Sequence, residues 1–200
     1  LDSESDTQTN RYSISFIYDN PSNNKSVQYS KIKAYVQDIN VDNKYSRNAI
    51  SYGRPANENR DQPFEHSSYG TEIQFRSDKK LGNVIHKISY GVDFSESQNE
   101  RERKITNNLT RVTKSQKETP DSTIQRSGIY LQDEITLNEK LDIIAGIRYD
   151  NFNLEPESDE AYLAGGVGVL DPAGYNEGAI SPKLSAIYKF NPELSIYGLY

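Results

Sequence analysis

Three side chains in this sequence of 200 residues could contact a metal ion or a haem iron: His66, Tyr69 and Tyr162. Histidine and tyrosine both serve as axial ligands of haem iron, and neutral imidazole is a common metal ligand. His66 is the strongest candidate, because it follows Phe64 and Glu65 at the end of a long polar stretch. A single loop histidine usually has no ligand, so we expect His66 to be an auxiliary contact at most.

No arrangement of residues in the sequence is typical of a catalytic site. Cysteine is absent, which excludes disulfides, thiolate metal sites and cysteine nucleophiles. No Ser/His/Asp combination and no metal-ligand spacing is present. The formal net charge is −6 and no basic block stands out, so nothing indicates nucleic-acid binding. We therefore expect a protein that is not an enzyme, with no intrinsic cofactor, no metal site and no nucleic-acid partner.

Apolar and polar residues alternate with a period of two along most of the chain, which is the pattern of β-strands. In one such segment, Ile88, Tyr90 and Val92 alternate with polar residues. The longest apolar run is far shorter than the roughly 20 residues that a membrane helix needs. The predicted strands are Arg11–Tyr18, Val27–Gln37, Tyr69–Arg76, Val84–Phe94, Ser127–Leu137, Leu141–Asp150, Lys183–Phe190 and Leu194–Tyr200.

The connections between these strands are alternately short and long without exception. In chain order they are Asp19–Ser26, Asp38–Ser67, Ser77–Gly82, Ser95–Thr123, Asn138–Lys140, Asn151–Ala179 and Asn191–Glu193. Structureless loops of this length are uncommon in a compact soluble domain. Outer-membrane barrels, by contrast, combine short periplasmic turns with long extracellular loops. The sequence therefore predicts an all-β fold, an antiparallel transmembrane β-barrel segment of about eight strands, in contact with outer-membrane lipid.

The length of the strands and their aromatic residues agree with this fold. Val84–Phe94 spans roughly 33 Å at about 3.3 Å per residue, or roughly 25 Å when tilted by about 40°, which is the height of an outer-membrane apolar band. The apolar parity is predicted to face lipid, with aromatic girdles of Tyr69, Phe94 and Tyr149 outside and Tyr18, Phe75 and Phe190 inside. The opposite parity is predicted to face the lumen: Glu72, Arg76, Lys87, Asp93, Glu134, Arg148 and Lys183.

Two polar residues share the apolar parity. Asp133 lies among Leu131 and Ile135 toward the periplasmic end, where either a small cost of lipid exposure or a β-bulge could accommodate it. His86 lies near a predicted periplasmic turn, and we expect it at the membrane interface beside the inner girdle.

Two stretches resemble the middle of the barrel of TonB-dependent receptors. Residues Ser127–Phe152 read SGIYLQDEITLNEKLDIIAGIRYDNF, and residues Gly178–Tyr200 read GAISPKLSAIYKFNPELSIYGLY. The "RYD" of Arg148–Asp150 and the "SPK" of Ser181–Lys183 match elements of that family. The resemblance implies that residues 1–200 are part of the barrel domain of a larger receptor, whose plug domain and remaining strands lie outside this chain. The missing start methionine agrees with an excerpt.

The resemblance also implies a function. Such receptors lie in the outer membrane of Gram-negative bacteria, have roughly 22 strands around a plug, and import scarce, iron-bearing nutrients with energy from the TonB complex, which contacts the plug segment. The segment Lys117–Ile135, with its Pro120–Thr123 element, is similar to the haem and haemoglobin receptor branch. The expected ligand is haem or a haem protein.

Three alternatives remain open at this stage. A ferric-siderophore receptor would use the same fold and loops. A complete eight-stranded outer-membrane barrel with an adhesive or structural role would also fit the strand number. A soluble β-sandwich would need short connections at both ends, which the alternation of short and long connections contradicts.

Overall fold

The computed structural model describes residues 2–22, 26–51, 54–163 and 171–199, and these are almost entirely β-strand. None of the described residues belongs to a helix long and apolar enough to cross a membrane. The elements are β1 (Asp2–Pro21), β2 (Tyr29–Ser51), β3 (Arg54–Leu81), β4 (Val84–Arg101), β5 (Arg103–Asn107), β6 (Thr113–Gln116), β7 (Asp121–Asn138), β8 (Leu141–Glu157), α1 (Glu160–Leu163), β9 (Tyr175–Asn191) and β10 (Leu194–Leu199).

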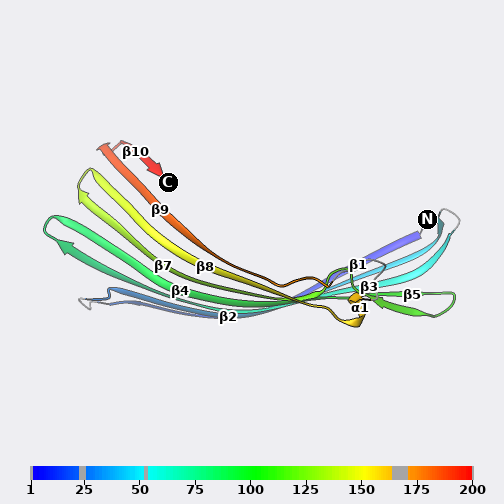
Figure 1. The fold of residues 1–200 in the computed structure, drawn as a ribbon. Coiled ribbons are helices and arrows are strands. Elements are labelled where there is room, and N and C mark those ends of the chain that lie inside the picture. The colour runs from blue at the N-terminus through cyan, green and yellow to red at the C-terminus, as the bar shows by residue number, and fades with distance from the viewer. Residues whose placement is uncertain (1, 23–25, 52–53, 164–170, 200) are drawn as a thin grey trace.

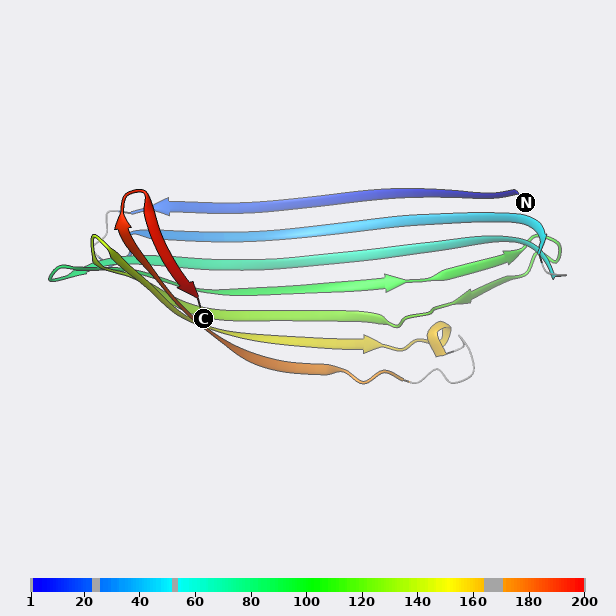
Figure 2. The same cartoon turned by 90° about the horizontal axis from the view of Figure 1, so that it is seen from above.

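The strands form one curved antiparallel sheet (Figure 1). Its order is β1-β2-β3-β4-β7-β8-β9-β10, so each of these eight strands pairs with the next one along the chain, and the short strands β5 and β6 extend it beside β3. The eight predicted strands and the all-β fold class are confirmed. Figure 2 shows that the β3–β4 and β9–β10 turns lie at one end of the sheet, and that α1 and the β5–β6 hairpin lie at the other. We call these the turn end and the loop end.

The long connections contain far more strand than the sequence predicts, and this prediction was wrong. Most of Asp38–Ser67 is a continuous hairpin, because β2 runs to Ser51 and β3 begins at Arg54. Ser95–Thr123 contains β5 and β6, and Asn151–Ala179 contains the end of β8, α1 and the start of β9. In the extension of β2, Ile39, Val41 and Tyr45 alternate with polar residues, but on the parity opposite to that of Ile32 and Val36, so the apolar face does not continue into it.

The register gives the sheet one apolar face and one polar face. In one row across the strands, Ile73 pairs with Val92, Val92 with Ile129, Ile129 with Tyr149, and Tyr149 with Ile180. Since directly opposed residues in an antiparallel pair point to the same side, these residues define the apolar face. The adjacent row belongs to the other face, the polar face, and contains Gln74, Gly91, Tyr130, Arg148 and Ser181.

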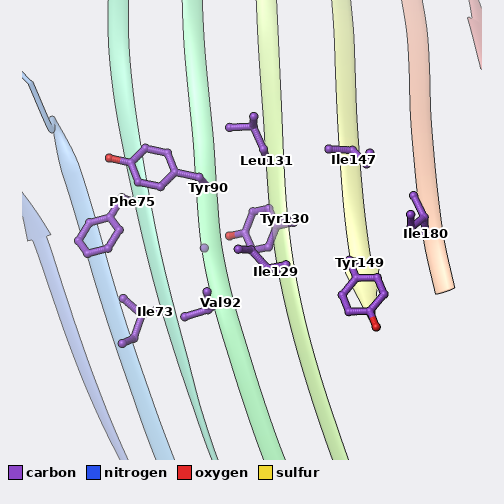
Figure 3. Close-up of a pocket in the computed structure, with 11 residues that line it drawn as sticks. Ile73, Phe75, Tyr90, Val92, Ile129, Tyr130, Leu131, Ile147, Tyr149 and Ile180 are labelled. Atoms are coloured by element: carbon purple, nitrogen blue, oxygen red, sulfur yellow. The ribbon is translucent and has the colours of Figure 1, made fainter. Parts of the chain in front are cut away.

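The apolar face is not covered by any other part of the described chain. No hydrophobic residue among the described ones is fully buried, and Leu131, Ile147 and Leu184 remain about half exposed. Figure 3 shows side chains of this face, together with Tyr130 from the polar face, which line an open pocket. Its volume is about 610 Å³. A soluble domain buries such residues in a core. We therefore expect this exposed face to contact lipid hydrocarbon.

Asp133 lies on the apolar face without a bulge. The register of β7 is unbroken there on both sides, with Ile88 and Ala145 as its cross-strand partners, and it shifts only between Thr136 and Asn138. The Nδ1 atom of His86 lies 2.7 Å from Oδ2 of Asp133, within hydrogen-bond distance. One carboxylate oxygen of Asp133 thus has a partner in His86 near the turn end, whereas Oδ1 is buried without one, and the register excludes the bulge.

The two faces make opposite predictions for the same substitution at adjacent positions. We expect Leu131→Arg to lower the free energy of unfolding by about 2–4 kcal/mol, because it puts a charge at mid-height on the apolar face. The matched control Gln132→Arg, on the polar face, should change it by less than about 1 kcal/mol. Urea unfolding of the protein reconstituted into lipid bilayers measures both values. Equal destabilisation by the two variants would contradict the assignment of the faces.

Candidate functional site

Every cation–aromatic contact found among the described residues lies on the polar face of the sheet. The distances from the cationic group to the ring centroid are 5.2–6.0 Å. Five of the six pairs are direct cross-strand partners in the register, and the sixth, Lys33 and Tyr35, lies along one strand. The five are Arg76–Tyr29, Arg60–Tyr45, Arg101–Phe64, Arg126–Phe152 and Arg148–Tyr130.

The apolar face has aromatic pairs of a different kind. Tyr69 and Phe94, which were predicted to belong to the outer girdle, have ring centroids 6.3 Å apart. Phe75 contacts Tyr90 at 5.6 Å on the same face, nearer the turn end. Among the described residues, rings contact cations on the polar face alone, whereas ring–ring pairs occur on both faces, since Phe152 and Tyr175 contact each other on the polar face at 6.1 Å. This difference is what a membrane-facing surface and a water-facing surface would each require.

Arg148 is the centre of an ionic network on the polar face. Its Nη2 atom lies 2.8 Å from Oδ1 of Asp93 and 2.7 Å from Oδ1 of Asp150. The guanidinium passes directly above Gly128, where an added Cβ would lie 2.2 Å from Nη2. Glycine at this position therefore gives Arg148 the room to reach across β7 to β4.

Tyr130 lies beside this network and covers Gly91. A Cβ at Gly91 would lie 2.5 Å from the backbone oxygen of Ile73 and 2.9 Å from the Tyr130 ring. The ring can rotate away, but the backbone oxygen belongs to the sheet and cannot. The packing of the Tyr130 ring against β4 thus depends on the absence of a side chain at Gly91.

His66 lies on the polar face toward the loop end, opposite Ile39 on β2 and Asn99 on β4. Its Nδ1 atom is 2.7 Å from Oδ1 of Asn99. An imidazole that donates from Nδ1 keeps the lone pair of Nε2 for a ligand. Phe64, two residues earlier on the same face, lies under the guanidinium of Arg101 at 5.2 Å.

A pocket of about 380 Å³ borders this group of residues. Arg103, on its wall, forms an ion pair with Glu118, whereas Arg101 is held by its stacking on Phe64. The pocket is lined by Val41, Asn43, Gln62, Phe64, Arg101, Glu102, Arg103 and Glu118. It thus combines apolar walls with two guanidinium groups, and sequence reasoning missed it because its residues come together only through the register.

The structure does not bring the three predicted ligand residues together. Tyr69 lies three residues after His66 on β3, so it points to the opposite, apolar face. Tyr162 lies in α1, within the third long connection. The described residues contain no group of three or more His, Asp or Glu side chains that could hold a metal ion. Of the three, only His66 has surroundings that suit a ligand.

The seven residues predicted to face the lumen all lie on the polar face. Arg76 pairs with Asp78 at 3.1 Å, and Lys183 bonds to Gln132 at 3.3 Å. Lys87 and Glu134 are direct cross-strand partners. Whether this face lines a lumen stays a prediction.

The close approach at Gly91 gives a stability prediction. We expect Gly91→Ala to lower the free energy of unfolding by about 1–3 kcal/mol, because the new methyl group overlaps a backbone oxygen of β3. Gly198→Ala is the control, since a Cβ there meets no atom within 4 Å. Urea unfolding in lipid bilayers again provides the measurement. A neutral Gly91→Ala variant would show that β3 and β4 are less closely packed than described.

The comparisons with known proteins agree with this fold. The family model "TonB dependent receptor-like, beta-barrel" matches residues 1–200. No curated protein matches the sequence. Among solved structures, the unliganded ferric citrate transporter FecA is 14% identical with a TM-score of 0.73. The match covers 96% of this chain and 27% of the FecA chain.

Two further solved structures are similar. The copper transporter OprC is 11% identical with a TM-score of 0.68, covering 94% of this chain and 30% of its own. The ferric preacinetobactin receptor BauA of Acinetobacter baumannii is 14% identical with a TM-score of 0.61, and the match covers 98% of this chain and 30% of the BauA chain. The chain thus spans between 27% and 30% of the length of these structures. With the family model matched over its whole length, the chain belongs to the β-barrel family of TonB-dependent receptors.

Proposed function

We propose that this chain is part of the barrel domain of a larger outer-membrane receptor that captures an anionic iron complex and imports it with energy from the TonB complex. The observation that carries this proposal is the row of cation–aromatic pairs on the polar face. Three of them, with Arg60, Arg101 and Arg126, lie toward the loop end. In the proposed orientation this end is extracellular and the polar face lines the lumen.

The stacked arginines suit anionic iron complexes for a physical reason. Stacking on a ring contributes about 0.5–1 kcal/mol at an exposed site and holds the plane of the guanidinium in place. Its N–H groups then point along the sheet, where they can donate to carboxylate, catecholate or hydroxamate oxygens in pairs. A lysine at the same position would present only a point charge.

A ferric siderophore is one candidate ligand. Two of the similar structures are a ferric citrate transporter and a ferric preacinetobactin receptor. Their low identities support the fold alone, so the ligand class rests on the arginine–aromatic surface.

Haem, free or taken from haemoglobin, is the second candidate, and the surroundings of His66 favour it. Nε2 of His66 could ligate the iron while Ile39, Val41 and Phe64 provide an apolar wall on the same face. Arg101 could then pair with a propionate. The resemblance of Lys117–Ile135 to the haem receptor branch points the same way.

The open sheet bears on the remaining alternative. β1 and β10 lie at separate edges and carry no strand on their outer sides in the described structure. This arrangement favours part of a larger barrel over a complete barrel of eight strands.

Binding measurements on the receptor test the role of the arginines. We expect Arg101→Gln and Arg126→Gln each to weaken binding of the cognate ferric complex roughly tenfold, or about 1.4 kcal/mol, because each removes a charged hydrogen-bond donor. Lys114→Gln, on exposed β6, is the control and should have no effect. Intrinsic fluorescence quenching by ferric citrate, a ferric catecholate and haem gives the affinities. Unchanged affinities for all three in both variants would contradict the proposed site.

The same receptor distinguishes haem from a siderophore. If haem is the ligand, titration should produce a shifted Soret band, and His66→Ala should shift it further or abolish it by removing one iron ligand. Asn99→Ala, which frees the ring of His66, should have a smaller effect of the same kind. The absence of any Soret shift in the unsubstituted receptor would discard haem and leave the siderophore proposal.

A further inference from the structure

A lysine with little solvent exposure joins the second and third long connections at the loop end. Lys117 lies between β6 and β7, and its Nζ atom is 2.5 Å from Oδ2 of Asp121 and 2.6 Å from Oδ2 of Asp159. Asp121 is the first residue of β7, whereas Asp159 immediately precedes α1 in the following connection. The side chain of Lys117 is only 10% exposed. One ammonium group therefore binds two segments that are far apart in the sequence.

The charges at this junction depend on one another. Burial lowers the pKa of Lys117, but its hydrogen bonds to Asp121 and Asp159 outweigh that effect and raise the pKa above its ordinary value. The hydrogen bond from Lys117 holds the pKa of Asp159 below its usual range, and the backbone N–H of Tyr162 adds to this effect. Without the ammonium group, the two carboxylates would face each other with no cation between them.

The position of α1 depends on the same carboxylate. Oδ1 of Asp159 accepts a hydrogen bond from the backbone N–H of Tyr162 at 2.8 Å, while Oδ2 binds Lys117. The backbone N–H of Lys117 also donates to the carbonyl oxygen of Ala161 at 3.2 Å. A helix of four residues is not stable by itself. Its place in the structure is therefore set by these contacts with the preceding connection.

The junction also contacts the backbone at the end of β4. Oδ1 of Asp121 accepts a hydrogen bond from the backbone N–H of Arg101 at 3.4 Å. A small pocket of about 280 Å³ lies between α1, β3 and the end of β4. Its residues Pro63, Glu65 and Glu100 have the parity opposite to that of Phe64 and His66, so it opens on the other face of the sheet. Segment 159–163 thus lies as a strap beside Arg101.

We propose that Lys117 is a latch that holds the strap, residues 159–163, against the second long connection. When the ammonium group leaves Asp159, the strap loses its anchor and moves away from the end of β4. The latch itself is independent of the proposed function.

A spin label on the strap tests the latch in the complete receptor in lipid bilayers. This chain has no cysteine, so Leu163→Cys creates one labelling position on a half-exposed side chain. Lys117→Met should shorten the rotational correlation time of the label several-fold. Lys114→Met, on exposed β6, is the matched control and should leave the spectrum unchanged, and Lys117→Arg should restore most of the immobilisation.

A second variant separates the latch from the helix cap. Asp159→Asn keeps an oxygen that can accept from the N–H of Tyr162 but removes the charge that binds Lys117, so it should free the label as Lys117→Met does. An unchanged spectrum in either variant, or an equal change in Lys114→Met, would overturn the proposal. Because these spectra need no ligand, a failure of the latch and a failure of the iron-complex proposal are distinguishable.

Discussion

Backbone hydrogen bonding between neighbouring strands is the constraint from which the other features of this sheet follow. In hydrocarbon, an unpaired N–H or C=O group costs several kcal/mol, so a membrane-spanning sheet must keep its ladder continuous. Here the register shifts only between Thr136 and Asn138 and between Leu194 and Ser195, both at the turn end. Side chains with a period of two then divide into two faces, and a slip of one residue would exchange them. Asp133 shows the strength of this constraint, because it stays on the apolar face, within hydrogen-bond distance of His86, and no bulge turns it to the other face.

The separation of the faces also explains the two kinds of aromatic contact. On the apolar face a ring can gain only from other apolar groups, as in Phe75 and Tyr90. On the polar face, arginine and tyrosine or phenylalanine sit opposite each other and combine stacking with solvation of the charge. Arg148 and Tyr130 are one such pair, and Arg101 and Phe64 are another. The same register that satisfies the backbone therefore builds the surface to which we assign ligand capture.

Much of this could be predicted from the sequence, because alternation and turn residues are local signals. Strand number, strand order and the polar or apolar side of each residue all followed from them. Even the pairing of Arg101 with Phe64 could have been found, since a two-residue turn at Gly82 and Asn83 fixes every pair between β3 and β4. The long extensions of β2 and β3 were not predicted, because the alternation of Ile39, Val41 and Tyr45 has the parity opposite to that of Ile32 and Val36, and the start of β3 is mostly polar. The junction at Lys117 was not predicted either, because it depends on how two irregular connections approach each other.

The central claim is that the apolar face contacts lipid and the polar face does not. The chain has no tryptophan, so single tryptophans placed one at a time at positions 129 to 135 on β7 would report on each face. In bilayers of brominated lipid, we predict strong fluorescence quenching at positions 129, 131 and 135 and weak quenching at 130, 132 and 134. Uniform quenching along β7, or the opposite alternation, would contradict the account.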